Sequence, residues 1–219
     1  MEGYLISISQ ALDKMDQDPT HIFLQAGVGG LAASFAAYCR KKLGYSPIII
    51  IVEPSYAPCL QRSIEMGRPT GVMGPASNMG RLDCKFPSRQ AFYSLSKTAN
   101  AFVSITEDES LKGTKFLSKR GINISQSSSA GFVALKKLVQ RGVNQIYSDF
   151  LSIVAEGRSM TTNEVDKLAR GRVYYGNEGK ELNLIDIVGE FNDAINLAAD
   201  LSDIEKYQII EYPKQKTEI

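Results

Sequence analysis

The sequence predicts an α/β protein with a parallel sheet, followed by a mainly helical C-terminal segment. Over the first part of the chain, short apolar runs alternate with stretches of helical periodicity. This order is typical of parallel α/β sheets. The run 48–52 has consecutive apolar residues, all β-branched. Such a run favours a parallel strand that is buried on both faces.

The expected elements follow in order along the first part of the chain. Apolar positions at helical spacing predict a first helix over 4–16, and a strand follows over 22–25. A glycine turn then leads into an alanine-rich helix that ends at Leu43, before Gly44 and Pro47 introduce the strand 48–52. The remaining elements are a helix over 56–66, a long loop over 68–87, a helix over 89–98, a strand over 101–105 and a helix over 107–119.

The second part of the chain is predicted to be mostly helical. Apolar residues recur every three or four positions from Ala130 to about Glu156, and no linker rich in Pro, Gly and Ser interrupts them. Gly142 weakens this helix by about 1 kcal/mol. The sequence 161–164 fits a capping box that opens another helix. A helix over 190–201 and a strand over 207–212 are expected to follow.

Composition excludes several classes of function. The 219 residues carry a net charge of +1, and Lys and Arg are scattered along the chain, so no nucleic-acid partner is expected. The longest apolar run is far too short to cross a membrane, and no signal peptide is recognisable. With a single histidine and three cysteines without metal-type spacing, we expect no metal site. The cysteines are interpreted as reduced thiols of a cytoplasmic protein.

The glycine turn is the candidate binding site. A strand, then Gly27-Val28-Gly29-Gly30 and Leu31, then a helix is an arrangement that binds phosphate through backbone N–H groups and the helix N-terminus. Three interpretations stay open on this pattern alone. One is a Rossmann-like dinucleotide site with Glu53 as the ribose ligand. The second is a loop for the phosphate of pyridoxal phosphate, and the third is a structural turn that binds nothing.

A wider set of residues resembles one enzyme family. The segments 19–32, 52–54, 79–85, 101–105 and 127–131 are similar to diaminopropionate ammonia-lyases, which belong to the tryptophan-synthase-β-like pyridoxal-phosphate enzymes of fold type II. The resemblance covers residues 1–137. It implies that the amides of Gly27, Val28, Gly29, Gly30 and Leu31 hold the cofactor phosphate. It also implies that Ser127 hydrogen-bonds the pyridine nitrogen, although the family often has Pro-Ser-Gly-Ala where this chain has Gln-Ser-Ser-Ser.

The catalytic lysine of that family has no recognisable counterpart. The resemblance places the Schiff-base lysine upstream of the glycine loop, where this chain offers only Lys14, without the family motif around it. A lyase of this type needs such a lysine to hold the cofactor and to move the substrate proton. We therefore expect weak, non-covalent binding of pyridoxal 5'-phosphate and no lyase activity.

The C-terminal residues resemble a different family. The segments 150–158, 169–174 and 182–186 are similar to the last part of signal peptide peptidase A, a serine peptidase of family S49 with a ClpP/crotonase-like domain. The resemblance covers residues 138–219 and implies a Ser/Lys mechanism. Ser148, Ser152, Lys167 and Lys180 fall outside the catalytic motifs, so we expect them at the surface and expect no peptidase activity.

Three hypotheses follow from the whole sequence. The first is a chimeric or truncated chain, a phosphate-binding lyase segment (residues 1–137) joined to a peptidase segment (residues 138–219). The second is a protein that binds a small phosphate-bearing cofactor without catalysis. The third is an interaction segment that self-associates. The first is favoured, with phosphate binding as the activity that it retains.

Overall fold

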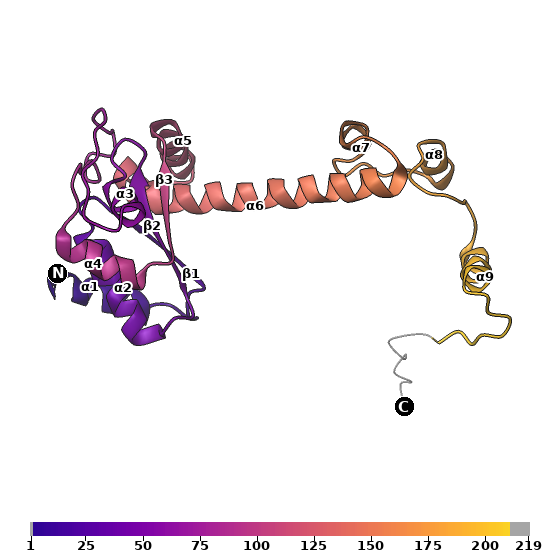
Figure 1. The fold of residues 1–219 in the computed structure, drawn as a ribbon, viewed down its shortest axis with the longest axis horizontal. Coiled ribbons are helices and arrows are strands. Elements are labelled where there is room, and N and C mark those ends of the chain that lie inside the picture. Colours follow the sequence, from indigo (N-terminus) through magenta and orange to yellow (C-terminus); the bar gives the residue numbers. More distant parts are fainter. Residues whose placement is uncertain (1, 211–219) are drawn as a thin grey trace. The chain divides into compact units, whose positions relative to one another are not determined.

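The computed structural model describes residues 2–210 and contains a three-stranded parallel sheet (Figure 1). The strands are β1 (His21–Gln25), β2 (Ile48–Pro54) and β3 (Ala101–Ile105), in the order β1-β2-β3. His21 pairs with Ile48, and Ile50 pairs with Ala101. Every residue of β2 after Ile48 is buried, as its unbroken apolar run predicts. The α/β class is thereby confirmed.

Helices connect and cover these strands. A short 3-10 turn, η1 (Glu2–Tyr4), leads into α1 (Leu5–Asp13), and α2 (Gly30–Leu43) joins β1 to β2. Between β2 and β3 lie α3 (Cys59–Glu65) and α4 (Arg89–Thr98), and α5 (Glu107–Ser118) follows β3. The remaining helices are α6 (Gln126–Arg158), α7 (Thr162–Leu168), α8 (Gly176–Glu181) and α9 (Phe191–Leu201).

The sheet separates two apolar clusters because successive side chains of a strand point to opposite faces. Ile49 and Ile51 face the small side chains of α2 and the apolar residues of α3 and α4. Ile50 and Val52 face residues of the 68–87 loop and of the first turns of α6. The loop is thus part of the core, although its composition has no apolar periodicity.

The structure divides into two compact units, unit 1 ending at Asn144 and unit 2 beginning at Gln145. Helix α6 contains both of these residues and continues without a break through Gly142, as the apolar periodicity predicts. The predicted capping box is present in α7, where the Thr161 side chain accepts from the Glu164 amide. Within residues 2–210 no helix combines the length and apolarity that crossing a membrane requires.

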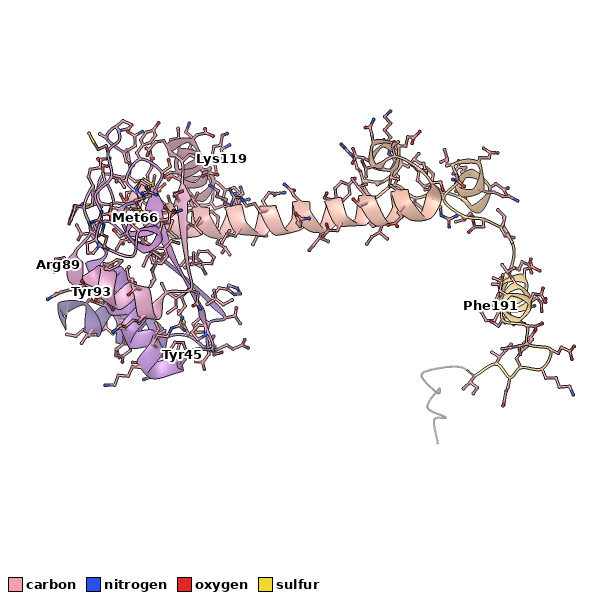
Figure 2. All side chains as sticks on the ribbon, viewed as in Figure 1. Tyr45, Met66, Arg89, Tyr93, Lys119 and Phe191 are labelled. Carbon is pink, nitrogen blue, oxygen red and sulfur yellow. The ribbon has the colours of Figure 1, made fainter. Side chains whose placement is uncertain are left out.

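Unit 2 has few buried apolar side chains. Among its described residues, 145–210, the buried hydrophobic residues are Ala155 and Val165. Large side chains on its helices are exposed, such as Phe191 at the start of α9, which is labelled in Figure 2. The helices of unit 2 therefore leave much of their apolar surface in contact with solvent.

Two predictions about unit 2 need correction. The strand expected over 207–212 is wrong where the structure describes it, because residues 207–210 form no strand. Residues 211 and 212 lie outside the described part. No other strand exists within 145–210 to pair with this segment, and an isolated strand leaves its N–H and C=O groups unpaired. Helix α8 has no counterpart among the predicted helices, since its sequence, GNEGKE, has no apolar periodicity.

Candidate functional site

A cavity of about 390 Å³ lies at the turn between β1 and α2. Its walls come from four separate parts of unit 1: η1, the turn itself with the residues beside it, the 68–87 loop and the start of α6. All six residues that the sequence analysis proposed for cofactor binding line it, namely Gly27, Val28, Gly29, Gly30, Leu31 and Ser127. The fold therefore brings Ser127 to the glycine turn across a long stretch of sequence.

The carbonyl groups of the turn are hydrogen-bonded within the protein, whereas, in the part of the chain that the structure describes, its N–H groups are not. The Gly27 carbonyl accepts from Cys59 Sγ at 3.8 Å, and the Val28 carbonyl accepts from the Ser88 amide at 2.9 Å. The Gly29 carbonyl accepts from the Ala33 amide at 2.8 Å. Within the described residues, the amides of 27–31 donate no hydrogen bond. A row of free N–H groups at the N-terminus of α2 provides the donors and the positive end of the helix dipole that an anion needs.

Glycine is required at Gly27 and Gly29 for the packing of the turn. Gly29 has φ +94°, and a Cβ there would lie 2.9 Å from both Ala91 Cβ and Leu60 Cδ1. At Gly27 a Cβ would lie 2.9 Å from Cys84 Sγ. Gly30 is different, because a Cβ at this position would meet no atom within 4 Å. The packed core thus fixes the loop, while Gly30 keeps the approach to the amides clear.

Ser127 is tied to the 68–87 loop. Its hydroxyl oxygen accepts from the Arg81 amide at 3.2 Å, and the residue is 7% exposed. Since the oxygen already accepts, the hydroxyl proton remains to be donated, and it has no acceptor among the described residues. This side chain can therefore donate a hydrogen bond to a ligand that has an acceptor atom, such as a ring nitrogen.

Arg81 also lines the cavity and was not singled out from the sequence. Among the described residues that line the cavity, Arg81 is the one that carries a charge. Its exposed guanidinium has no ion-pair or hydrogen-bond partner within residues 2–210. The cavity therefore has an excess of positive charge, from Arg81 together with the helix N-terminus. Arg81 lies in the segment 79–85 that resembles the lyase family, but the loop has no periodicity that would mark Arg81 itself as a cavity residue.

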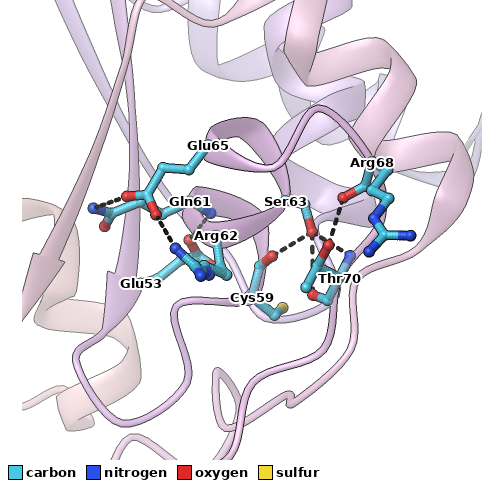
Figure 3. Close-up of polar contacts among 8 residues, drawn as sticks. All are labelled: Glu53, Cys59, Gln61, Arg62, Ser63, Glu65, Arg68 and Thr70. Atoms are coloured by element: carbon cyan, nitrogen blue, oxygen red, sulfur yellow. Dashed lines mark hydrogen bonds and ion pairs between the residues drawn. The ribbon is translucent and has the colours of Figure 1, made fainter.

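Glu53 has a structural role beside the turn. Its carboxylate accepts from the Leu60 amide (2.8 Å) and from the Gln61 amide (2.7 Å), so it caps the N-terminus of α3. Figure 3 shows Glu53 beside Gln61. Glu53 is 1% exposed, and burial raises its pKa to about 7. Burial, with the nearby Glu53 charge, also raises the pKa of the Cys59 thiol to about 12, so the thiol stays protonated. Because Glu53 does not line the cavity, the dinucleotide hypothesis loses its ribose ligand.

Comparison with known proteins identifies the family. The sequence model of the pyridoxal-phosphate dependent enzymes matches residues 1–155. The chain belongs to this family. The model of peptidase family S49 matches residues 126–205, so both families match the residues of α6 from 126 to 155. The composite resemblance seen in the sequence is confirmed.

The individual relatives of this pyridoxal-phosphate family member fall into the same two groups. Diaminopropionate ammonia-lyase of Salmonella typhimurium is 33% identical over 123 residues, which cover 52% of the chain and 30% of the lyase. A putative signal peptide peptidase SppA of Enterococcus faecium is 37% identical over 81 residues, 37% of the chain and 24% of the peptidase. The chain thus spans less than a third of the length of either relative.

Solved structures support the fold of unit 1. Diaminopropionate ammonia-lyase of Escherichia coli, in complex with an aminoacrylate-PLP azomethine intermediate, has a TM-score of 0.56 and 28% identity. The match covers 61% of the chain and 36% of the lyase. The processed form of threonine deaminase isoform 2 from Solanum lycopersicum has a TM-score of 0.56 at 19% identity, covering 60% of the chain and 38% of the deaminase. These matches are to pyridoxal-phosphate enzymes of fold type II.

Proposed function

We propose that unit 1 binds pyridoxal 5'-phosphate, or a related phosphate ester, weakly and without a covalent bond. The chain would then act as a partial or chimeric member of the family that retains the phosphate site but not the lyase reaction. The observation that carries this proposal is the row of unbonded amides at 27–31, which faces an open cavity. Membership of the family supports pyridoxal phosphate as the ligand.

The residues of the cavity fit this group. The amides of Gly29 and Gly30, which line the cavity, would bind phosphate oxygens, and Arg81 would add the charge that a dianion requires. Ser127 would donate to the ring nitrogen, leaving that nitrogen unprotonated. Pyridoxal phosphate supplies an electron-withdrawing ring and an aldehyde to enzymes that hold it. No lysine is among the described residues that line this cavity, so the protein is proposed to hold the ligand by hydrogen bonds and charge alone.

A ligand without the aldehyde tests this proposal. Pyridoxine 5'-phosphate cannot form an imine with surface lysines, so calorimetric titration reports the non-covalent site. We expect saturable binding that inorganic phosphate displaces and that unphosphorylated pyridoxine does not reproduce. Ser127→Ala should weaken the binding of pyridoxine 5'-phosphate but leave the binding of inorganic phosphate unchanged. Equal binding of pyridoxine and its phosphate would refute the role of the glycine turn.

Lyase activity provides a second test of the same proposal. The purified chain should release no ammonia from diaminopropionate in the presence of pyridoxal phosphate. Because Lys14 is the lysine that precedes the glycine turn in this sequence, Lys14→Ala is the matched control. Ammonia release that exceeds the rate with free pyridoxal phosphate, and that Lys14→Ala abolishes, would contradict the non-catalytic assignment.

A second candidate function concerns unit 2, which matches the S49 family. We propose that it serves as an assembly segment, because Val173, Tyr175 and Phe191 are more than 70% exposed while so few apolar residues of the unit are buried. Exposed apolar surface of this kind favours association. Sedimentation velocity of the full chain should show self-association that weakens in Val173→Ser/Phe191→Ser. A monomer at every concentration would contradict this function.

A further inference from the structure

A second cavity, of about 350 Å³, lies between α5 and α6 and shares no lining residue with the glycine-turn cavity. Four cationic side chains, Lys112, Lys136, Lys137 and Arg141, line it together with one carboxylate, Glu109. All of them belong to unit 1. The scattered charges of the sequence are therefore gathered locally where these two helices meet.

Ion pairs neutralise only two of the four cations. Lys137 Nζ lies 2.9 Å from Glu109 Oε2 and donates to the Ser104 carbonyl at 3.1 Å. Lys112 pairs with Asp108 at 2.7 Å. Within residues 2–210, Lys136 and Arg141 pair with no carboxylate. The cavity thus keeps two cations whose charge the protein does not balance.

The base of the cavity differs from its rim. A Cβ at Gly113 would clash with Val133 Cγ2, so the two helices are in close apolar contact there. The Lys137–Glu109 pair is partly buried, with side-chain exposures of 16% and 33%. Lys136 and Arg141 are exposed above this base. An apolar base with unbalanced cations at the rim suits an anion that carries a small apolar body.

We propose that this α5–α6 cavity binds a small organic phosphate, with its apolar body against Gly113 and Val133 and its phosphate at Lys136 and Arg141. Arg141 is expected to contribute most, because a guanidinium can bind two phosphate oxygens at once. The Lys136 ammonium lies 4.4 Å from the centroid of the Phe116 ring, which holds it near the cavity. The proposal is independent of the glycine turn.

Phenyl phosphate is the probe, and the full chain carrying Gly30→Asp is the background, so that binding at the glycine turn is suppressed. We expect saturable binding by calorimetry that weakens at least 10-fold in Arg141→Ala, weakens less in Arg141→Lys, which keeps the charge but loses the bidentate contact, and weakens again when salt rises from about 50 to 500 mM. Phenol should not bind. Inorganic phosphate should bind more weakly than phenyl phosphate because it lacks the apolar body.

Lys119→Ala is the matched control, because Lys119 is a cation just beyond α5 and lies outside the cavity (Figure 2). Circular dichroism and thermal melts verify that each variant folds. The proposal is overturned if phenyl phosphate fails to bind, or if Lys119→Ala weakens binding as much as Arg141→Ala does. Phenol binding as tightly as phenyl phosphate would also overturn it, since the cations would then have no part in recognition.

Discussion

Substituting Gly30 by aspartate should separate the stability of the protein from its affinity for phosphate. Gly30 is the first residue of α2, and a Cβ there would meet no atom within 4 Å. A carboxylate in the first turn interacts favourably with the helix dipole, by about 0.3–1 kcal/mol. Replacing glycine in a helix also removes backbone entropy from the unfolded chain. Gly30→Asp should therefore fold at least as stably as the wild type.

The same carboxylate should repel the ligand. At roughly 6 Å, two unit negative charges repel by about 0.7 kcal/mol in a water-like medium and by about 3 kcal/mol at the effective dielectric of a protein surface. A phosphate that carries nearly two charges should thus bind at least 10-fold more weakly. The melting temperature should stay level or rise by about 1–4 °C, given that range of stabilisation in a chain of this size.

Calorimetry with pyridoxine 5'-phosphate and a thermal melt measure the two effects on one sample. Gly142→Ala is the control, because Gly142 is a helical glycine of α6 with open space around it and lies far along the sequence from the turn. It should be stabilised by up to about 1 kcal/mol with unchanged affinity. If Gly30→Asp bound pyridoxine 5'-phosphate as tightly as the wild type, the turn would not be the phosphate site.

Three further substitutions test the structure around the site and in unit 2. Gly29→Ala should lower the free energy of unfolding by at least about 2 kcal/mol, because it combines a positive φ with a clash against Leu60. A melting temperature that falls by less than about 2 °C would contradict this packing. Burial raises the pKa of Glu53 to about 7, so its contribution to stability is complete below about pH 4.5 and is lost as pH rises through 7. In urea titrations, the free energy of unfolding of the wild type should therefore fall over this pH range by about 3 kcal/mol more than that of Glu53→Gln. If the two free energies changed with pH in parallel, the raised pKa of Glu53 would be disproved. Thr161→Ala removes the cap of α7 and should lower the stability of this helix by about 1 kcal/mol. Amide exchange in residues 162–168 should then be faster, and unchanged exchange would show that the cap is dispensable.

Local sequence signals predicted the elements that local physics determines. The β-branched run of β2, the glycine turn before α2 and the capping box at Thr161 each act within a few residues, and each is present in the structure. The continuous helix through Gly142 was also predictable, because apolar spacing outweighs the cost of one glycine. Six lining residues of the cavity were recognised for the same reason, with the help of a family resemblance for Ser127.

Features that depend on distant contacts were not accessible from the sequence. Arg81 reaches the cavity because the 68–87 loop packs beneath the sheet, and its position is set by the hydrogen bond to Ser127 rather than by any local period. The grouping of Lys136 and Arg141 beside α5 depends in the same way on how two helices meet. The strand expected over 207–212 had suitable residues, but within the described residues 145–210 there is no strand for it to pair with.

The unbonded amides of the glycine turn also have a kinetic consequence. Residues 27–31 comprise the turn after β1 and the first two residues of α2, and within the described residues their N–H groups donate no hydrogen bond, whereas the interior N–H groups of β1 and α2 are held in hydrogen bonds. In deuterium they should exchange within the dead time of a manual experiment, as a short fast segment between two slow ones. A phosphate that settles on them would slow this segment alone, and the change would map the bound anion without any label on the ligand.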